Sequence, residues 1–160
     1  MPEPSVIHST FAIERRYPHE PERVFAAFAD PELKRRWFSP GADQETEPFS
    51  LDFRVGGTER VAYRLAPGLP VSGVIANEGV IQDIVPNRRV VTASTMALNG
   101  RRFSSSLVTI EILPAEGGTE LICTHQGAFF EGADGPQIRE TGWRHLLDQL
   151  GKELDRAAQD

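Results

Sequence analysis

The chain has 160 residues, of which 39% are hydrophobic and 25% charged, and a formal net charge of −6 at pH 7. This length predicts a single domain over residues 1–160. The acidic balance argues against nucleic-acid binding, which needs a basic surface, and no apolar run approaches the roughly 20 residues of a membrane helix, so we expect no membrane insertion.

The first elements are predicted from alternation and from proline positions. Residues 6–17 alternate in their second half, with Phe11 and Ile13 on one face, which predicts a strand. Pro21 suits the first turn of a helix, where its missing N–H has no partner to lose. A short helix is therefore expected to follow the first strand.

A second short helix is predicted directly after the first. Asp30 can cap its first turn and Pro31 can occupy the first helical position. The helix is expected to end near Trp37 and Phe38, before a Ser-Pro-Gly sequence that cannot continue it.

The middle of the chain reads as strands joined by tight turns. Glycine or asparagine turns at 56–57, 99–100 and 116–118 separate apolar alternating runs. Parallel pairing would need crossovers of a dozen or more residues, so these turns predict antiparallel pairing. Strands are expected at residues 49–55, 58–65, 74–85, 90–98, 103–113 and 119–126.

The last segment, residues 138–158, predicts a long amphipathic helix. Its apolar side chains recur at helical spacing and must be buried against another element; they are Trp143, Leu146, Leu147, Leu150, Leu154 and Ala157. The opposite side carries Arg144, Asp148, Glu153 and Arg156. The predicted fold is α+β: a curved antiparallel sheet of six or seven strands wrapped around this helix, with two short helices after the first strand.

The order of local phrases resembles the START-like (SRPBCC, Bet v 1-like) helix-grip superfamily. More narrowly, it is similar to bacterial relatives of the C-terminal domain of the heat-shock-protein-90 ATPase activator. The matching phrases are Arg15–Pro18, Val24–Phe28, Asp30–Pro31, Trp37, Asp52–Gly57, Ile84–Val91, Gly118–Leu121, His125–Gly127, Gly142–Trp143, Leu147 and Leu150. The resemblance implies a cavity between sheet and terminal helix and a link to the stress response. It carries over no catalytic residue, because the family has no accepted catalytic motif, and it does not specify a function, because the superfamily includes carriers, receptors and cyclases alike.

Several large side chains are candidates for lining such a pocket, and the alternative for each is packing in the core, which base rates favour for Trp143 and His125. Gly142 would allow close backbone approach beside Trp143, and the loop over residues 127–137, with Phe129 and Phe130, would close the cavity. The candidate ligand-binding residues are Trp37, Phe38, Phe53, Tyr63, Phe103, His125, Trp143 and Leu147.

Other reactive side chains give weaker patterns. His125 shares strand parity with Cys123, yet positions two apart on a strand lie roughly 6–7 Å apart, too far for a nucleophile and its base. Cys123, the sole cysteine, excludes an internal disulfide, and the four scattered histidines predict no metal site. Arg15 and Arg60 would need carboxylate partners if they faced inward.

We therefore expect binding of a small, largely hydrophobic molecule, with no catalytic residue, cofactor or metal. Residues 1–8 lack a signal-peptide pattern, which predicts a cytoplasmic protein. Two alternatives stay open: a chaperone-interacting module, for which Phe129 and Phe130 would suit a partner, and a cyclase- or hydrolase-like enzyme using His125, Tyr63 and Glu78. A homodimer through an exposed strand is also open.

Overall fold

The computed structural model describes residues 5–158, so the domain limits predicted at residues 1 and 160 lie outside the described residues. The elements follow the chain in the order β1 (Ile7–Tyr17), α1 (Pro21–Ala29), α2 (Pro31–Phe38), β2 (Ser50–Leu51), β3 (Thr58–Arg64), β4 (Val74–Val85), β5 (Arg89–Leu98), β6 (Arg101–Ala115), β7 (Gly118–Phe129) and α3 (Pro136–Ala158).

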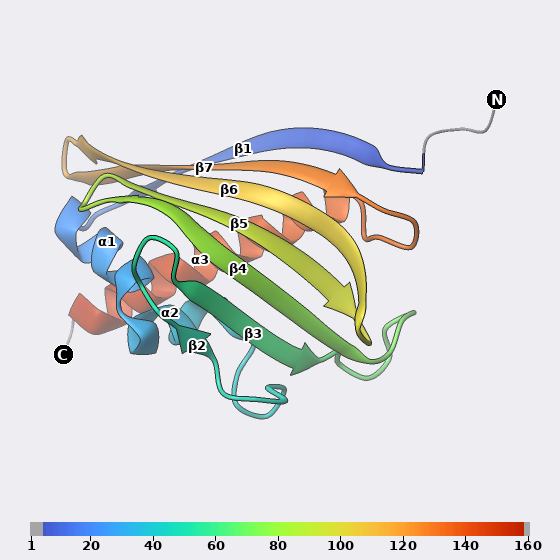
Figure 1. Ribbon diagram of the computed structural model, residues 1–160. Helices are drawn as coiled ribbons and strands as arrows, with labels where there is room; N and C mark the ends of the chain where they lie inside the picture. The colour runs from blue at the N-terminus through green and yellow to red at the C-terminus, as the bar shows by residue number, and fades with distance from the viewer. Residues whose placement is uncertain (1–4, 159–160) are drawn as a thin grey trace.

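All strands belong to one seven-stranded sheet in the order β1-β7-β6-β5-β4-β3-β2, and every neighbouring pair is antiparallel. The first strand therefore pairs with the last, which places β1 and β2 at the two edges. The sheet curves over α3, and α1 and α2 lie below one end of it (Figure 1). The α+β architecture predicted from the sequence is confirmed.

Local sequence signals account for the element boundaries. The Asp30 carboxylate accepts hydrogen bonds from the backbone N–H groups of Glu32 and Leu33, at 2.9 and 3.3 Å, and so caps α2. Asn99 and Gly100 have φ angles of 51° and 84°, as a two-residue turn between β5 and β6 requires. The Asn99 side chain also accepts a hydrogen bond from the Val74 N–H, which fixes the start of β4.

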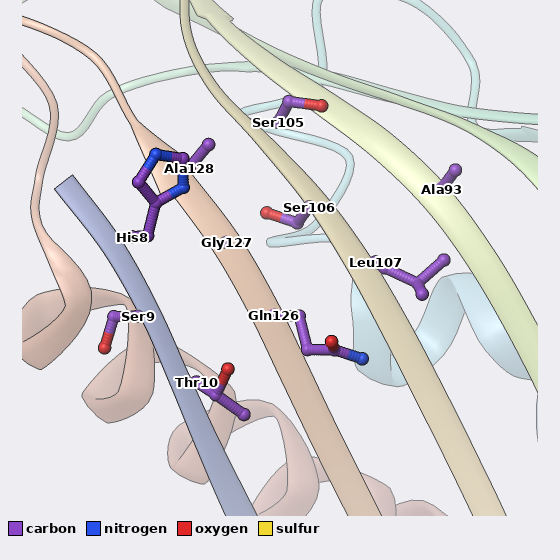
Figure 2. A pocket seen from close by; sticks show the side chains of 10 residues that line it. All are labelled: His8, Ser9, Thr10, Ala93, Ser105, Ser106, Leu107, Gln126, Gly127 and Ala128. Atoms are coloured by element: carbon purple, nitrogen blue, oxygen red, sulfur yellow. The ribbon is translucent and has the colours of Figure 1, made fainter. Parts of the chain in front are cut away.

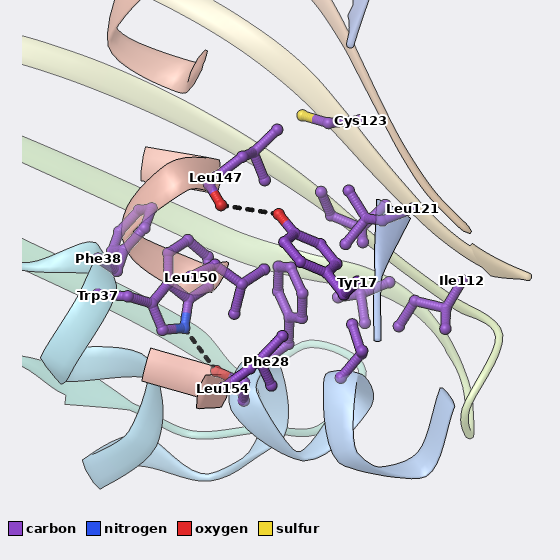
Figure 3. Packing of buried hydrophobic residues seen from close by; sticks show 14 of the residues in the cluster. Tyr17, Phe28, Trp37, Phe38, Ile112, Leu121, Cys123, Leu147, Leu150 and Leu154 are labelled. Carbon is purple, nitrogen blue, oxygen red and sulfur yellow. Dashed lines mark hydrogen bonds between the residues drawn. The ribbon is translucent and has the colours of Figure 1, made fainter. Parts of the chain in front are cut away.

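The apolar face of α3 forms the centre of the core. Leu147, Leu150 and Leu154 are each at most 2% exposed, and burial of a leucine side chain contributes about 1.5–3 kcal/mol. The Tyr17 hydroxyl donates a 2.8 Å hydrogen bond to the Leu147 carbonyl and so links β1 to α3 (Figure 3). This contact and the packed leucines hold the helix against the sheet.

The strand predicted over residues 49–55 is wrong except at Ser50–Leu51. Beyond these residues the chain folds into tight turns, with Arg54 N–H bonded to Asp52 O and Gly57 N–H bonded to Arg54 O. A Cβ at Gly57 would lie 2.0 Å from the Asp52 carbonyl oxygen, so the turn requires glycine there. Alternation alone misled because these turns satisfy the backbone locally.

Two predictions at the C-terminal end also need correction. Residues 127–129 continue β7, and the Phe129 side chain is only 2% exposed because it packs on the inner face of the sheet beside His125 and Arg139. It therefore neither plugs a cavity nor offers a partner surface. Glu153, predicted on the polar side of α3, is 7% exposed because α2 packs there and Arg36 reaches its carboxylate.

Candidate functional site

A cleft of about 570 Å³ lies between the end of α2, the first half of α3 and the inner face of β3, β4 and β5. Its apolar lining consists of Trp37, Phe38, Pro40, Val61, Met96, Ile138, Trp143 and Leu146. Its polar lining consists of Arg36, Ser39, Tyr63, Asn77, Asp134, Arg139, His145 and Gln149. Gly41 and Gly142 complete it.

The aromatic wall of the cleft is held rigidly from behind. Trp37 donates a 2.9 Å hydrogen bond from Nε1 to the Ala27 carbonyl, and its ring meets Phe28 edge-on at 5.0 Å (Figure 3). The ring centroids of Phe38 and Trp143, which both belong to this wall, lie 6.2 Å apart. Behind Phe38, Lys34 forms a buried ion pair with Glu59, and its Nζ lies 4.6 Å from the Phe38 ring centroid.

Arg139 is the most deeply buried charged side chain of the lining, with 7% of the residue exposed. Its Nε and Nη2 atoms donate to the two oxygens of Asp134, each at 2.8 Å. Nη2 also donates to the Ser104 hydroxyl at 2.8 Å. The guanidinium is therefore neutralised and oriented by partners from the preceding loop and from β6.

A bulge in β6 creates the surroundings of this arginine. Met96 pairs with Ser104 and Ala97 with Arg102, so Phe103 is the additional residue on β6. Phe103 and Ser104 are consecutive, yet they are 7% and 1% exposed. A bulge redirects side chains in this way, and here it turns both residues inward against Arg139.

Arg139 ends a column of stacked rings on the inner face of the sheet. Its Cζ lies 5.1 Å from the Phe129 centroid and 5.8 Å from the Phe103 centroid. Phe129 lies 6.1 Å from the His125 ring, which stacks in parallel on Phe11 at 4.8 Å. These contacts join β1, β7, β6 and α3 beside the cleft.

His125 is buried in this column at 1% exposure, and its Nδ1 has no hydrogen-bond partner among residues 5–158. Burial, reinforced by the nearby positive charge of Arg139, lowers the pKa of His125 to about 4. The imidazole is therefore neutral at physiological pH. Cys123, fully buried on the same strand, has its pKa raised to about 12 by burial, so its thiol is not an activated nucleophile.

The structure brings together four of the eight predicted site residues. Trp37, Phe38, Tyr63 and Trp143 line the cleft, and Phe103 and His125 lie in the adjoining ring column. The other two lie elsewhere: Phe53 packs edge-on against Phe25 at 5.6 Å, and Leu147 is fully buried in the core.

Gly142 does not serve a close backbone approach, because a Cβ placed there would meet no atom within 4 Å. Arg15 and Arg60 are not buried charges: Arg15 lies 3.4 Å from Asp148, and Arg60 forms ion pairs with Glu47 and Glu78. Sequence reasoning missed Arg139 and Asp134. An acidic residue just before a helix and an arginine in its first turns are common, so this pattern only weakly indicates a buried ion pair.

The three side chains considered for an enzyme do not converge. Tyr63 lines the cleft, and His125 is enclosed between Phe11 and Phe129. The Glu78 side chain is 59% exposed and pairs with Arg60.

Within residues 5–158, no three His, Cys, Asp or Glu side chains are grouped as a metal ion would need. No helix in that range is long and apolar enough to cross a membrane.

A second hollow, of about 500 Å³, lies over β1, β7, β6 and β5 (Figure 2). It is lined mostly by short side chains, including Ala93, Ser105 and Ala128, and by none that is acidic or strongly basic. It therefore lacks both the aromatic wall and the buried charged group of the cleft.

The family model for "Activator of Hsp90 ATPase homolog 1-like protein" matches residues 18–155. The chain belongs to this family. None of the curated proteins matches it.

Solved structures agree with this assignment. The chain is 47% identical to Mll3558 from Rhizobium loti, covering 93% of this chain and 99% of that one, with a TM-score of 0.81. It is 37% identical to an uncharacterised protein from Rhizobium leguminosarum, covering 95% and 97%, with a TM-score of 0.86. A protein of unknown function from Staphylococcus aureus, SA2116, is 19% identical over 97% and 98%, with a TM-score of 0.76, and so shares the fold.

Proposed function

We propose that this member of the family binds a small, largely apolar molecule in the cleft between the sheet and α3. The observation that carries the proposal is the cleft of about 570 Å³, whose wall is formed by Trp37, Phe38 and Trp143. Small-molecule sites have this size and combine a mainly apolar lining with a few oriented polar groups.

The aromatic wall supports an apolar ligand because its outer members are not fully covered by the chain. Trp37, on α2, is 1% exposed. Trp143 and Leu146, one turn apart on α3, are only partly buried. A ligand in the cleft would remove their remaining apolar surface from water, and each buried Å² would contribute about 25 cal/mol.

Native mass spectrometry of the freshly purified protein, followed by denaturing extraction, tests this proposal. We expect a bound small molecule that denaturation releases. In a Gly142→Leu variant the new side chain would extend into the cleft, since Gly142 lines it and a Cβ there has free space around it. This variant should lose the molecule, whereas Arg144→Leu, on an exposed side of α3, should retain it.

Equal occupancy in Gly142→Leu would contradict binding in the cleft. If the wild-type protein is purified empty, titration with 2-acetylnaphthalene decides the question, because the cleft should bind this aromatic probe saturably. No saturable binding would contradict the proposal.

The family match supports a second proposal, contact with an Hsp90-type chaperone. Exposed apolar side chains on the β3–β4 loop, Leu69 and Val71, would suit such a contact, with 53% and 49% of their surfaces exposed. The test is the ATPase rate of a purified bacterial Hsp90 with and without this protein. Stimulation that Leu69→Ser/Val71→Ser abolishes would support it, and an unchanged rate would contradict it.

A further inference from the structure

We infer that the ligand carries a neutral oxygen acceptor, such as a carbonyl oxygen, which binds Arg139 and Tyr63 in the cleft. This inference rests on the proposed function and specifies the chemistry of the molecule bound there. It depends on which hydrogen-bond donors the cleft leaves without partners.

Arg139 has two such donors. A guanidinium carries five N–H groups. Nε and Nη2 are engaged by Asp134 and Ser104, while Nη1 has no hydrogen-bond partner among residues 5–158. The residue is 93% buried and lines the cleft, and Nη1 is not among the enclosed side-chain atoms that lack a partner, so this atom keeps contact with solvent-accessible space. Water in the cleft can accept its hydrogen bonds, so a ligand that displaces this water must supply an acceptor in its place or leave the donor unpaired at a cost.

Tyr63 supplies a second donor to the same space. Tyr63 lines the cleft, and its hydroxyl is neither hydrogen-bonded to the described residues nor among their enclosed atoms without a partner. Burial raises the pKa of Tyr63, while the charges of Arg139 and Asp134 act on it in opposite directions. The hydroxyl therefore stays protonated, and Tyr63 and Arg139 line the same cleft.

The charge balance selects a neutral acceptor over an anion. Asp134 already neutralises Arg139 through two hydrogen bonds, so a ligand carboxylate would add an uncompensated negative charge to a buried site. The rings of Phe103 and Phe129 beside the guanidinium also restrict its movement toward a new partner. A carbonyl oxygen would accept from Nη1 without disturbing the existing pair.

A matched pair of ligands tests the inference. 2-Acetylnaphthalene and 2-isopropenylnaphthalene have nearly the same shape, but only the first carries an oxygen acceptor. We expect the wild-type protein to bind 2-acetylnaphthalene more tightly, by on the order of tenfold, because a hydrogen bond from a charged donor contributes about that much. 2-Naphthoate at pH 7 should bind more weakly than 2-acetylnaphthalene.

Variants locate the acceptor. Arg139→Met should bring the affinity ratio of the first two ligands close to one, and Tyr63→Phe should lower it a few-fold. Arg144→Met, which removes an exposed arginine from the same helix, should leave it unchanged. If Arg139→Met does not fold, Tyr63→Phe decides.

Equal wild-type affinity for the two ligands, or a ratio that neither variant changes, would overturn the inference while leaving apolar binding intact. Tighter binding of 2-naphthoate would overturn the preference for a neutral ligand. Binding of none of the three would contradict the proposed function itself, and the inference with it.

Discussion

The Arg139 guanidinium and the Asp134 carboxylate are joined by two parallel hydrogen bonds of 2.8 Å, across the point where the β7–α3 loop enters the helix. Their side chains are 8% and 23% exposed. The pair therefore ties the loop to the first turns of α3 and positions the one buried cation of the cleft lining.

Removing one partner of this pair should cost more stability than removing a surface pair on the same helix. Arg139→Met leaves a mostly buried carboxylate without its partner, so we expect a loss of about 3 kcal/mol in the free energy of unfolding. Glu140→Gln, which breaks the exposed pair with Arg144, should cost at most about 0.5 kcal/mol. Urea unfolding measures both, and equal losses would show that the Arg139–Asp134 pair is only a surface contact.

His125 should make stability fall with acidification. Its pKa is lowered from 6.5 to about 4 in the folded state, so between these values the unfolded chain binds the proton and the folded chain does not. The contribution of neutral His125 is complete above about pH 6.5 and declines as the pH falls toward 4, by roughly 3 kcal/mol in total.

The variant His125→Phe should flatten this part of the pH profile while keeping the ring stack on Phe11. His8→Gln, at an exposed position of β1, serves as the control and should keep the wild-type slope. Identical slopes for wild-type protein and His125→Phe between pH 4 and 7 would contradict the buried, neutral imidazole.

The two tyrosines should differ in what their hydroxyls contribute to stability. Tyr17→Phe removes the 2.8 Å hydrogen bond to the Leu147 carbonyl and leaves that buried oxygen without this donor, so a loss of about 1–2 kcal/mol is expected. Tyr63→Phe removes a hydroxyl that has no partner among the described residues and should change stability by less than about 0.5 kcal/mol. Thermal unfolding measures the stability lost in each variant. A larger loss in Tyr63→Phe than in Tyr17→Phe would contradict these roles of the two hydroxyls.

Gly142→Leu should raise stability while lowering ligand affinity. A glycine inside a helix costs up to about 1 kcal/mol relative to a good helix former, and the space around this position is open. The same space is part of the cleft, so the new side chain competes with the ligand. Calorimetric titration with 2-acetylnaphthalene should show at least tenfold weaker binding, and unchanged affinity would remove the cleft as its site.

The architecture could be predicted from the sequence because its signals are local, and four of the residues that line the cleft are among the sequence-predicted candidates. The period of the α3 leucines, the Asp30-Pro31 helix start and the Asn99-Gly100 turn each identify an element on their own. Trp37 and Trp143 were candidates because the helices that carry them could be predicted.

The charged end of the cleft could not be predicted in this way. Arg139 is buried because a bulge turns Phe103 and Ser104 inward together, and that bulge depends on the pairing of β5 with β6. Strict alternation along β6 would place these two neighbours on opposite faces. The same assumption produced the wrong strand at 49–55, where local turns replaced pairing.

The most direct test of ligand binding in the cleft uses the two tryptophans as reporters. The Trp37 indole N–H is bonded to the Ala27 carbonyl in the core, whereas Trp143 is only partly buried and lines the cleft. In a nitrogen–proton NMR titration with 2-acetylnaphthalene, the indole signal of Trp143, assigned by its absence in Trp143→Phe, should shift and saturate with the ligand. The signal should remain in place in Gly142→Leu. A Trp143 signal that does not move while the ligand binds, or that moves equally in Gly142→Leu, would contradict binding in the cleft.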